Sequence, residues 1–121
     1  MSYVVEYTNE FEAWWQTLKP SDHISIDAHV RQLEARGPNL PFPYSSGLRG
    51  SRHAHMRELR VQSSGKPLRI FYAFDPRRMA ILLIGGDKTG NKRFYETMIP
   101  ISDELYDEHL AELAKEDGHE R

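Results

Sequence analysis

The chain has 121 residues and a formal net charge of −2, with 39% hydrophobic and 28% charged residues, the balance of one ordinary globular domain. It contains no cysteine, which excludes a disulfide framework, a thiolate metal site and a cysteine nucleophile. No apolar run approaches the roughly 20 residues that span a bilayer, and the first residues lack a signal-peptide pattern. We therefore expect a soluble cytoplasmic protein with one domain over residues 1–121.

Charge is unevenly distributed along the chain. Residues 49–93 contain eleven basic and three acidic residues, a net charge of +8, whereas residues 1–48 carry −3 and residues 94–121 carry −7. A basic middle between acidic ends favours a surface that binds an anionic partner. The alternative is that the acidic ends fold back and neutralise the middle, and charge alone leaves both readings open.

The chain begins with a predicted strand and a short helix. Residues 3–7 are mainly β-branched and aromatic, which indicates the strand. Asn9, followed three residues later by Glu12, predicts a capping box at the start of the helix. Trp14 and Trp15 belong to an apolar stripe at helical spacing, so we expect at least one of them in the core rather than in a base-stacking platform.

A second helix is predicted from an N-cap at Ser21 to the stop signal Gly37-Pro38, and it forms an antiparallel hairpin with the first. Residues 38–54 are rich in proline, glycine and serine, which predicts an irregular loop. His53 and His55 in this loop have a spacing that could hold a metal or supply a base. Because no third ligand is evident, we expect solvated loop histidines instead.

Three strands are predicted next, over residues 56–62, 67–75 and 79–84. The segment between the first two predicts a hairpin turn. The third strand is apolar throughout and is expected to be central, with Gly85-Gly86 at its end. The glycines that follow it lack the spacing of a nucleotide-binding loop, which excludes that kind of site.

The end of the chain predicts helix on both sides of Pro100, over residues 92–99 and, as a longer helix, 101–115. The predicted order is therefore β-α-α-β-β-β-α. This order indicates an α+β fold in which a small, mostly antiparallel sheet packs against an N-terminal helical hairpin and a C-terminal helix.

Two arginines are expected to meet across the predicted hairpin. A two-residue turn at Ser64-Gly65 places Arg60 directly opposite Arg69, with Glu58 and Phe71 on the same face. Like charges in this position destabilise a sheet, so either Glu58 bridges them or the site is built for an anion such as phosphate. The planar arginine fork suits phosphate, which it binds through two donors.

A pattern of three stretches extends over most of the chain: Met56-Arg57-Glu58-Leu59-Arg60, then Pro67-Leu68-Arg69-Ile70-Phe71-Tyr72, then Ile81-Leu82-Leu83-Ile84 with Gly85-Gly86-Asp87-Lys88 behind it. In combination they resemble the RelE/ParE superfamily of toxins from type II toxin–antitoxin modules, closest to its HigB-like branch. The resemblance implies a RelE-like fold and a ribosome-dependent mRNA endoribonuclease. Such an enzyme cleaves by attack of a ribose 2′-hydroxyl on the adjacent phosphate and needs no metal or other cofactor.

The resemblance also implies catalytic residues. Arg60 and Arg69 match arginines of the first two central strands, and the second of these holds the scissile phosphate in the family. Lys88 matches the basic residue after the apolar strand, and Tyr95 lies where the family places a tyrosine or histidine for proton transfer. We expect nearby cations to lower the pKa of Tyr95 and so assist that transfer.

The partners implied are mRNA, the ribosome and a cognate antitoxin, often of the helix-turn-helix type. Six further cations of the basic middle are candidates for RNA binding: Arg49, Arg52, Arg57, Lys66, Lys92 and Arg93. The chain departs from the family pattern in its acidic C-terminal helix and in the absence of lysine from residues 49–55. Two alternatives therefore stay open: a non-enzymatic ParE-like inhibitor of DNA gyrase, and an inactive member that only binds the antitoxin.

Overall fold

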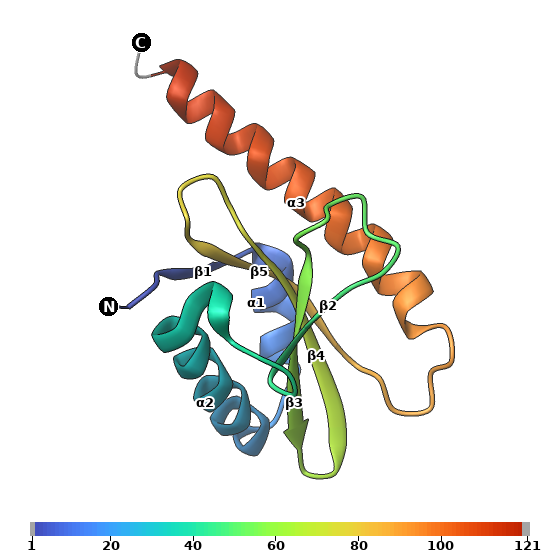
Figure 1. Ribbon diagram of the computed structural model, residues 1–121. Coiled ribbons are helices and arrows are strands. Elements are labelled where there is room, and N and C mark those ends of the chain that lie inside the picture. The colour runs from blue at the N-terminus through green and yellow to red at the C-terminus, as the bar shows by residue number, and fades with distance from the viewer. Residues whose placement is uncertain (1, 120–121) are drawn as a thin grey trace.

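The computed structural model describes residues 2–119, which form three α-helices and one five-stranded sheet (Figure 1). The strands are β1 (Val5–Tyr7), β2 (Ser45–Gly47), β3 (Arg57–Ser63), β4 (Lys66–Phe74) and β5 (Ala80–Asp87). The helices are α1 (Asn9–Gln16), α2 (Pro20–Arg36) and α3 (Phe94–His119), with a 3-10 turn at Gly37–Asn39. Within these residues the sheet order is β1-β5-β4-β3-β2, and only the β1–β5 pairing is parallel. The predicted α+β fold with a mostly antiparallel sheet is confirmed.

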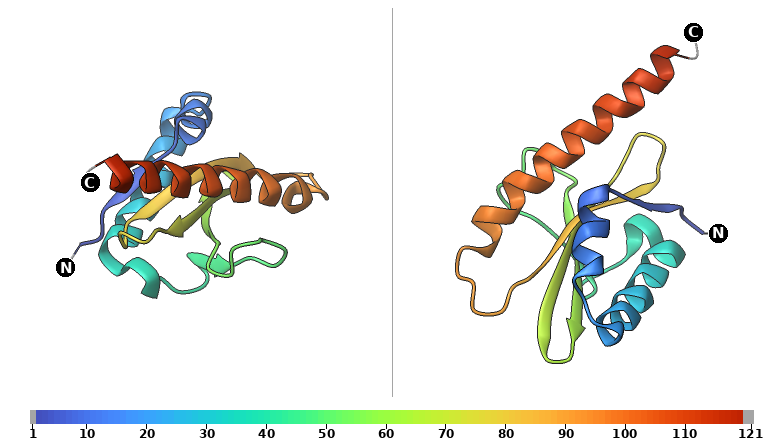
Figure 2. Two further views of the ribbon diagram at one scale, coloured as in Figure 1. Left: turned by 90° about the horizontal axis from the view of Figure 1, so that it is seen from above. Right: turned by 180° about the vertical axis from the view of Figure 1, so that it is seen from behind.

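The two faces of the sheet are covered by different helices. On one face, Phe11 of α1 and Ile26 of α2 pack in the same core cluster as β3 and β4. On the other face, Leu105 and Tyr106 of α3 pack with buried residues of β4 and β5. Figure 2 shows α3 running past the sheet, away from the α1–α2 pair. We call these two sides the α1–α2 face and the α3 face.

Strand alternation sorts the central residues between these faces. Leu59, Val61, Leu68, Ile70 and Tyr72 belong to the cluster under α1 and α2, so the intervening residues of β3 and β4 point to the α3 face. Ser64 and Gly65 join the two strands with positive φ angles of 49° and 77°, as a two-residue hairpin turn requires. The predicted register, with Arg60 opposite Arg69, is confirmed.

The caps of the first two helices differ from the predictions. Thr8, not Asn9, is the N-cap of α1, because its hydroxyl accepts the Phe11 N–H at 2.9 Å and also donates to a β5 carbonyl. In α2 the N-cap is Lys19, and Ser21 lies inside the helix. Pro20 explains this start, since proline suits the first helical position, where its missing N–H is not needed.

The loop after α2 contains a strand that the sequence did not reveal. β2 pairs antiparallel with the start of β3, opposite Arg57, Glu58 and Leu59. Its sequence, Ser-Ser-Gly, has low strand propensity, so only its pairing with β3 holds it extended. The remainder of the predicted loop is irregular apart from the 3-10 turn at its start.

Gly85 and Gly86 do not end the third predicted strand, because β5 continues through Asp87. They allow a helix to approach each face closely. A Cβ added at Gly85 would overlap the ring of Trp14 in α1, and one at Gly86 would lie 2.9 Å from the ring of Phe94 in α3. This contact, with the packing of both tryptophans against the core, confirms the core role predicted for them.

The predicted break at Pro100 is wrong, because α3 is continuous through this residue. Pro100 is exposed, whereas Ile99 and Leu105 on either side of it are buried, so packing outweighs the lost backbone hydrogen bond. Between residues 2 and 119 no helix is both long and apolar enough to cross a membrane.

Candidate active site

A buried carboxylate, Glu58, lies at the centre of the polar cluster on the α3 face. Its Oε1 accepts a hydrogen bond from the Tyr95 hydroxyl at 2.7 Å, and its Oε2 accepts one from the Ser46 hydroxyl at 2.7 Å. Arg60 donates Nη1 to Oε2 at 3.3 Å, and Arg69 places Nε 3.6 Å from Oε1. Side chains of β2, β3, β4 and α3 therefore converge on one carboxylate, which bridges the two facing arginines.

The two arginines have different environments. Arg69 is only 6% exposed; its Nη1 donates to the Leu68 carbonyl at 3.1 Å, while its Nε is buried without a hydrogen-bond partner among the described residues. This Nε forms an ion pair with Glu58 Oε1 at 3.6 Å in place of a hydrogen bond. Arg60 is more open, and its guanidinium lies 5.2 Å from the ring centre of the exposed Phe42.

Tyr95 joins this cluster from the first turn of α3. Its burial, together with the hydrogen bond to Glu58, raises its pKa, and the opposing effect of Arg69 is smaller. The expectation that nearby cations lower the pKa of Tyr95 is therefore wrong, and the phenol keeps its proton at neutral pH. Lys88 lies over the ring of Tyr95, with Nζ 5.1 Å from the ring centre. The four predicted catalytic residues thus lie in one cluster.

Two of the six candidate RNA-binding cations lie on the opposite face of the sheet from the Glu58 cluster. Arg57 points to the α1–α2 face, where its Nε donates to Ser45 at 2.9 Å. Lys66 donates to the buried carboxylate of Asp22 in α2 at 2.9 Å. Strand alternation explains why Arg57 and Lys66 face α1 and α2. In its own strand, each residue has the opposite parity to the arginine of the cluster.

The other four candidates lie outside the sheet. Arg52 is exposed but forms an ion pair with Asp107 of α3. Arg49, Lys92 and Arg93 are exposed and form no ion pair among residues 2–119. The last two lie in the segment just before α3, close in sequence to Tyr95.

The acidic C-terminal helix folds back on part of the basic middle, but not on the arginine cluster. Asp103 accepts hydrogen bonds from the Ser51 hydroxyl and the Arg52 backbone N–H, and Asp107 pairs with Arg52 and His53. The carboxylate that contacts Arg60 and Arg69 instead comes from their own sheet. The reading in which the acidic ends neutralise the basic middle is therefore confirmed for the segment around Arg52, and the binding of an anion at the arginine cluster stays a prediction.

Both loop histidines form contacts with α3, and His55 is exposed to solvent as predicted, whereas His53 is half-buried. His53 Nε2 lies 2.7 Å from an oxygen of Asp107, and His55 Nε2 lies 3.2 Å from the Tyr106 hydroxyl. In the part of the chain that the structure describes, no three histidine, aspartate or glutamate side chains are placed to hold a metal ion.

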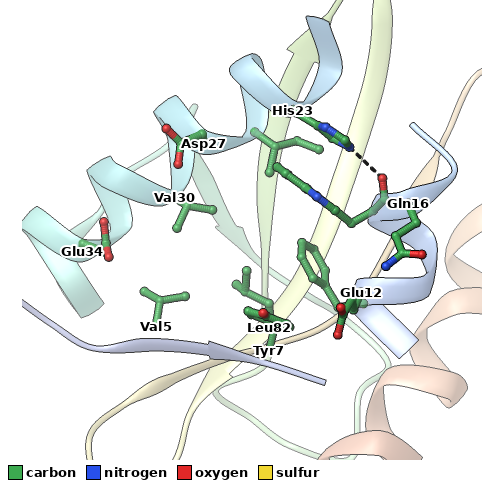
Figure 3. A pocket seen from close by; sticks show the side chains of 12 residues that line it. Val5, Tyr7, Glu12, Gln16, His23, Asp27, Val30, Glu34 and Leu82 are labelled. Atoms are coloured by element: carbon green, nitrogen blue, oxygen red, sulfur yellow. Dashed lines mark hydrogen bonds between the residues drawn. The ribbon is translucent and has the colours of Figure 1, made fainter. Parts of the chain in front are cut away.

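A groove of about 710 Å³ lies on the opposite side, between α1, α2 and β1 (Figure 3). Its lining includes Phe11, Trp15 and Ile26, and the lining residue His23 contacts the Trp15 carbonyl at 2.8 Å. Its lining contains Glu12 and other acidic residues but no lysine or arginine. The carboxylates of Glu12, Asp27 and Glu34 make this lining unfavourable for an anion, in contrast to the Glu58 cluster with its two arginines.

Glu58 is the site residue whose central position sequence reasoning did not anticipate. The sequence placed it on the right face and raised it as a bridge between the arginines, but not as the acceptor for Tyr95 and Ser46. The available signal was an acidic residue inside an otherwise basic and apolar stretch. Such a residue in a buried strand needs partners, because an unpaired buried charge is strongly destabilising.

Comparison with known proteins agrees with this architecture. The family model described as phage derived protein Gp49-like (DUF891) matches residues 13–107. Two proteins of Mycobacterium tuberculosis that are named as candidate toxins, HigB2 and HigB3, are each 41% identical over 103 residues, 84% of this chain. The alignment covers 89% of HigB3 but 51% of HigB2, so the chain spans about half the length of the latter.

Solved structures share the fold at low sequence identity. A double arginine-to-alanine variant of the E. coli toxin RelE in the free state matches with a TM-score of 0.59 and 14% identity, covering 81% of this chain and 96% of its own. RelE in the RelE–RelB complex from Pyrococcus horikoshii matches with a TM-score of 0.54 and 14% identity, covering 74% and 99%. The chain belongs to the Gp49-like family, in which it is of the HigB type, and it has the fold of the RelE toxins.

Proposed function

We propose that this chain is the toxin of a type II toxin–antitoxin module and that it acts as a metal-independent endoribonuclease on translated mRNA at the ribosome. The observation that carries the proposal is the convergence of Arg60, Arg69 and Tyr95 on one point of the α3 face, where Arg69 Nε is buried and reaches Glu58 as an ion pair at 3.6 Å rather than through a hydrogen bond. A phosphate at this point would accept stronger hydrogen bonds from these guanidinium groups.

The cluster contains the groups that strand cleavage by a 2′-hydroxyl requires. The reaction needs a proton acceptor for the 2′-hydroxyl, positive charge beside the phosphoryl oxygens, and a proton donor for the departing 5′-oxygen. Arg60 and Arg69 supply the positive charge, Tyr95 takes part in proton transfer, and Lys88 lies over the Tyr95 ring. The expected products carry a 2′,3′-cyclic phosphate and a 5′-hydroxyl.

The surroundings of the cluster suit single-stranded RNA. Phe42 is 68% exposed and already stacks with the Arg60 guanidinium, so it offers a platform for an unpaired base. Arg49, Lys92 and Arg93 provide exposed positive charge for the phosphate backbone. Arg57 and Lys66 take no part in this RNA surface, because they face α1 and α2.

The proposed protein partner is a cognate antitoxin. Support comes from the relatives named as HigB toxins and from the RelE–RelB complex among the structures with this fold. We expect the antitoxin to be of the helix-turn-helix type, and expression of the chain without it to arrest growth.

The direct test is a cleavage assay with purified protein and ribosomes programmed with an end-labelled mRNA, with and without EDTA. The proposal predicts cleavage that EDTA does not inhibit and that Arg69→Gln abolishes. Arg36→Gln is the matched control, since Arg36 is an exposed arginine at the far end of α2. Intact mRNA together with DNA damage in expressing cells would instead support a gyrase inhibitor, and no phenotype would support an inactive member.

A further inference from the structure

Glu58 has an arrangement that a simple counter-ion for two arginines does not need. Its two short hydrogen bonds, both 2.7 Å, come from the hydroxyls of Tyr95 and Ser46. Its contacts with the arginines are longer, 3.3 Å to Arg60 and 3.6 Å to Arg69, and neither arginine binds it through two donors. Arginine–carboxylate pairs built for stability are typically short and bidentate. The carboxylate is therefore aimed at the hydroxyls.

This arrangement also resolves a difficulty of the proposed function. A tyrosine that takes a proton from a 2′-hydroxyl must either be a phenolate or pass its own proton on. Burial and Glu58 raise the pKa of Tyr95, which removes the phenolate at neutral pH. The phenol already donates its proton toward a carboxylate oxygen at 2.7 Å, so the second route is preformed.

We propose that Glu58 is the terminal proton acceptor of a Tyr95–Glu58 relay that activates the 2′-hydroxyl of RNA. The inference rests on the proposed ribonuclease function and assigns to Glu58 a role within that site. Tyr95 contacts the substrate, and Glu58 acts through it, so Glu58 is a positioning and proton-accepting residue behind the tyrosine.

In the proposed cleavage step, proton transfer through Tyr95 to Glu58 accompanies the exchange of two bonds at phosphorus. The 2′-hydroxyl gives its proton to the Tyr95 oxygen while the phenolic proton passes to Glu58 Oε1. The 2′-oxygen forms a bond to phosphorus, and the bond from phosphorus to the 5′-oxygen breaks. The 5′-oxygen leaves with a proton from the Lys88 ammonium, and afterwards Glu58 releases its proton to water while Lys88 regains one.

The relay couples proton transfer to charge stabilisation. While Glu58 is ionised, its charge attracts both guanidinium groups. When the proton arrives, that charge disappears at the moment when negative charge develops on the phosphoryl oxygens. Arg60 and Arg69 are then free to stabilise the phosphate, including through the Arg69 Nε that has no partner in the described structure.

The test compares Glu58→Gln, Tyr95→Phe and the double variant in single-turnover cleavage on mRNA-programmed ribosomes. The relay predicts a loss of at least ~100-fold in the cleavage rate for each single variant. The double variant loses little more than either, because both changes interrupt one pathway. Binding of an mRNA with a 2′-deoxy nucleotide at the cleavage position stays within about threefold of wild type.

Two further variants control for structure. Ser46→Ala removes the other short hydrogen bond to Glu58 while leaving the Tyr95 contact, so it is expected to slow cleavage far less than Tyr95→Phe does. Glu58→Asp keeps the charge but withdraws the oxygen from Tyr95, so the relay predicts a slow enzyme with normal binding. This variant also serves if Glu58→Gln does not fold.

Three outcomes would overturn the relay while leaving the ribonuclease intact. They are near wild-type cleavage by Glu58→Gln or Glu58→Asp, losses that multiply in the double variant, and a loss of rate matched by an equal loss of 2′-deoxy mRNA binding. The last outcome would assign Glu58 to holding the arginines alone. If the wild-type protein itself does not cleave, the proposed function fails instead.

Discussion

Asp22 on the α1–α2 face and Glu58 on the α3 face are both buried carboxylates beside basic side chains, and they differ in how many hydrogen bonds their groups form. On the α1–α2 face, Asp22 accepts hydrogen bonds from Ser63 at 2.6 Å and Lys66 at 2.9 Å, and from the Lys19 backbone N–H at 3.4 Å. The Ser63 and Lys66 contacts lower the pKa of Asp22 to about 2. On the α3 face, Glu58 lies beside an arginine Nε with no partner.

This difference separates a structural ion pair from a candidate reactive site. The Asp22 group links the start of α2 to the turn between β3 and β4. The donors around Asp22 already bind its carboxylate, so none is available for a ligand. In the Glu58 group, arginine donors remain without hydrogen bonds. This destabilises the free protein unless an anion binds to them. Each prediction below tests one side of this contrast, beginning with the largest expected effect.

The largest expected effect is the loss of cleavage rate caused by Arg69→Gln on the α3 face. Loss of the buried guanidinium removes positive charge from the position proposed for the phosphoryl oxygens, so the cleavage rate should fall about 10²–10³-fold. Single-turnover cleavage measures this, with thermal unfolding as a check on folding. A folded Arg69→Gln protein that cleaves at the wild-type rate contradicts the assignment of the site.

The adjacent glycines offer a matched pair across the faces. Gly85→Ala forces a methyl group into the ring of Trp14 and should lower the free energy of unfolding by about 1–3 kcal/mol without slowing cleavage by the folded fraction. In Gly86→Ala the added methyl group instead contacts the ring of Phe94. Because Phe94 precedes Tyr95 in α3, this variant should cleave more slowly. Denaturant unfolding and cleavage assays of both variants check this, and equal effects on both properties would remove the distinction between the faces.

Asp22→Asn should change stability and its pH dependence but not cleavage. The pKa of Asp22 is depressed in the folded protein, so its contribution is present above the unfolded value of 3.8 and is lost as the pH falls toward about 2. Wild-type melting temperatures should therefore fall more steeply across this window than those of Asp22→Asn, which melts several degrees lower at neutral pH. Parallel curves for the two proteins would show that Asp22 is not stabilised by its partners.

The smallest effect is expected from the double variant Lys92→Gln with Arg93→Gln. Each side chain is exposed and contributes only backbone electrostatics, so RNA binding should weaken severalfold and its salt dependence should become shallower by about 0.7 per lost phosphate contact. Binding titrations at several salt concentrations measure both. An unchanged salt dependence would place the RNA path elsewhere.

The parts of this molecule that local rules control were predictable from the sequence. A two-residue turn and strand parity fix which residues face each other, so the Arg60–Arg69 pairing followed from the turn alone. The cap at Thr8, the strand β2 and the unbroken α3 depend on tertiary contacts that override local preference. For Pro100 in particular, burial of its neighbours decides the outcome.

The same limit applies to the site. The pairing register of β3 and β4 is enough to place the two arginines. The number of groups that contact Glu58 depends in addition on the pairing of β2 with β3 and on the packing of α3 against the sheet. The direction of the Tyr95 pKa shift depends on burial as well as on charge, and the sequence shows only the charge. Strand parity alone places Arg57 and Lys66 on the face opposite to the arginine pair.

The chemistry of the RNA ends produced in the presence of EDTA tests the central claim most directly. After incubation of the wild-type protein with mRNA-programmed ribosomes, the account predicts fragments that end in a 2′,3′-cyclic phosphate and begin with a 5′-hydroxyl, and none with Arg69→Gln. Intact mRNA, or fragments that begin with a 5′-phosphate and disappear when EDTA is added, would contradict it.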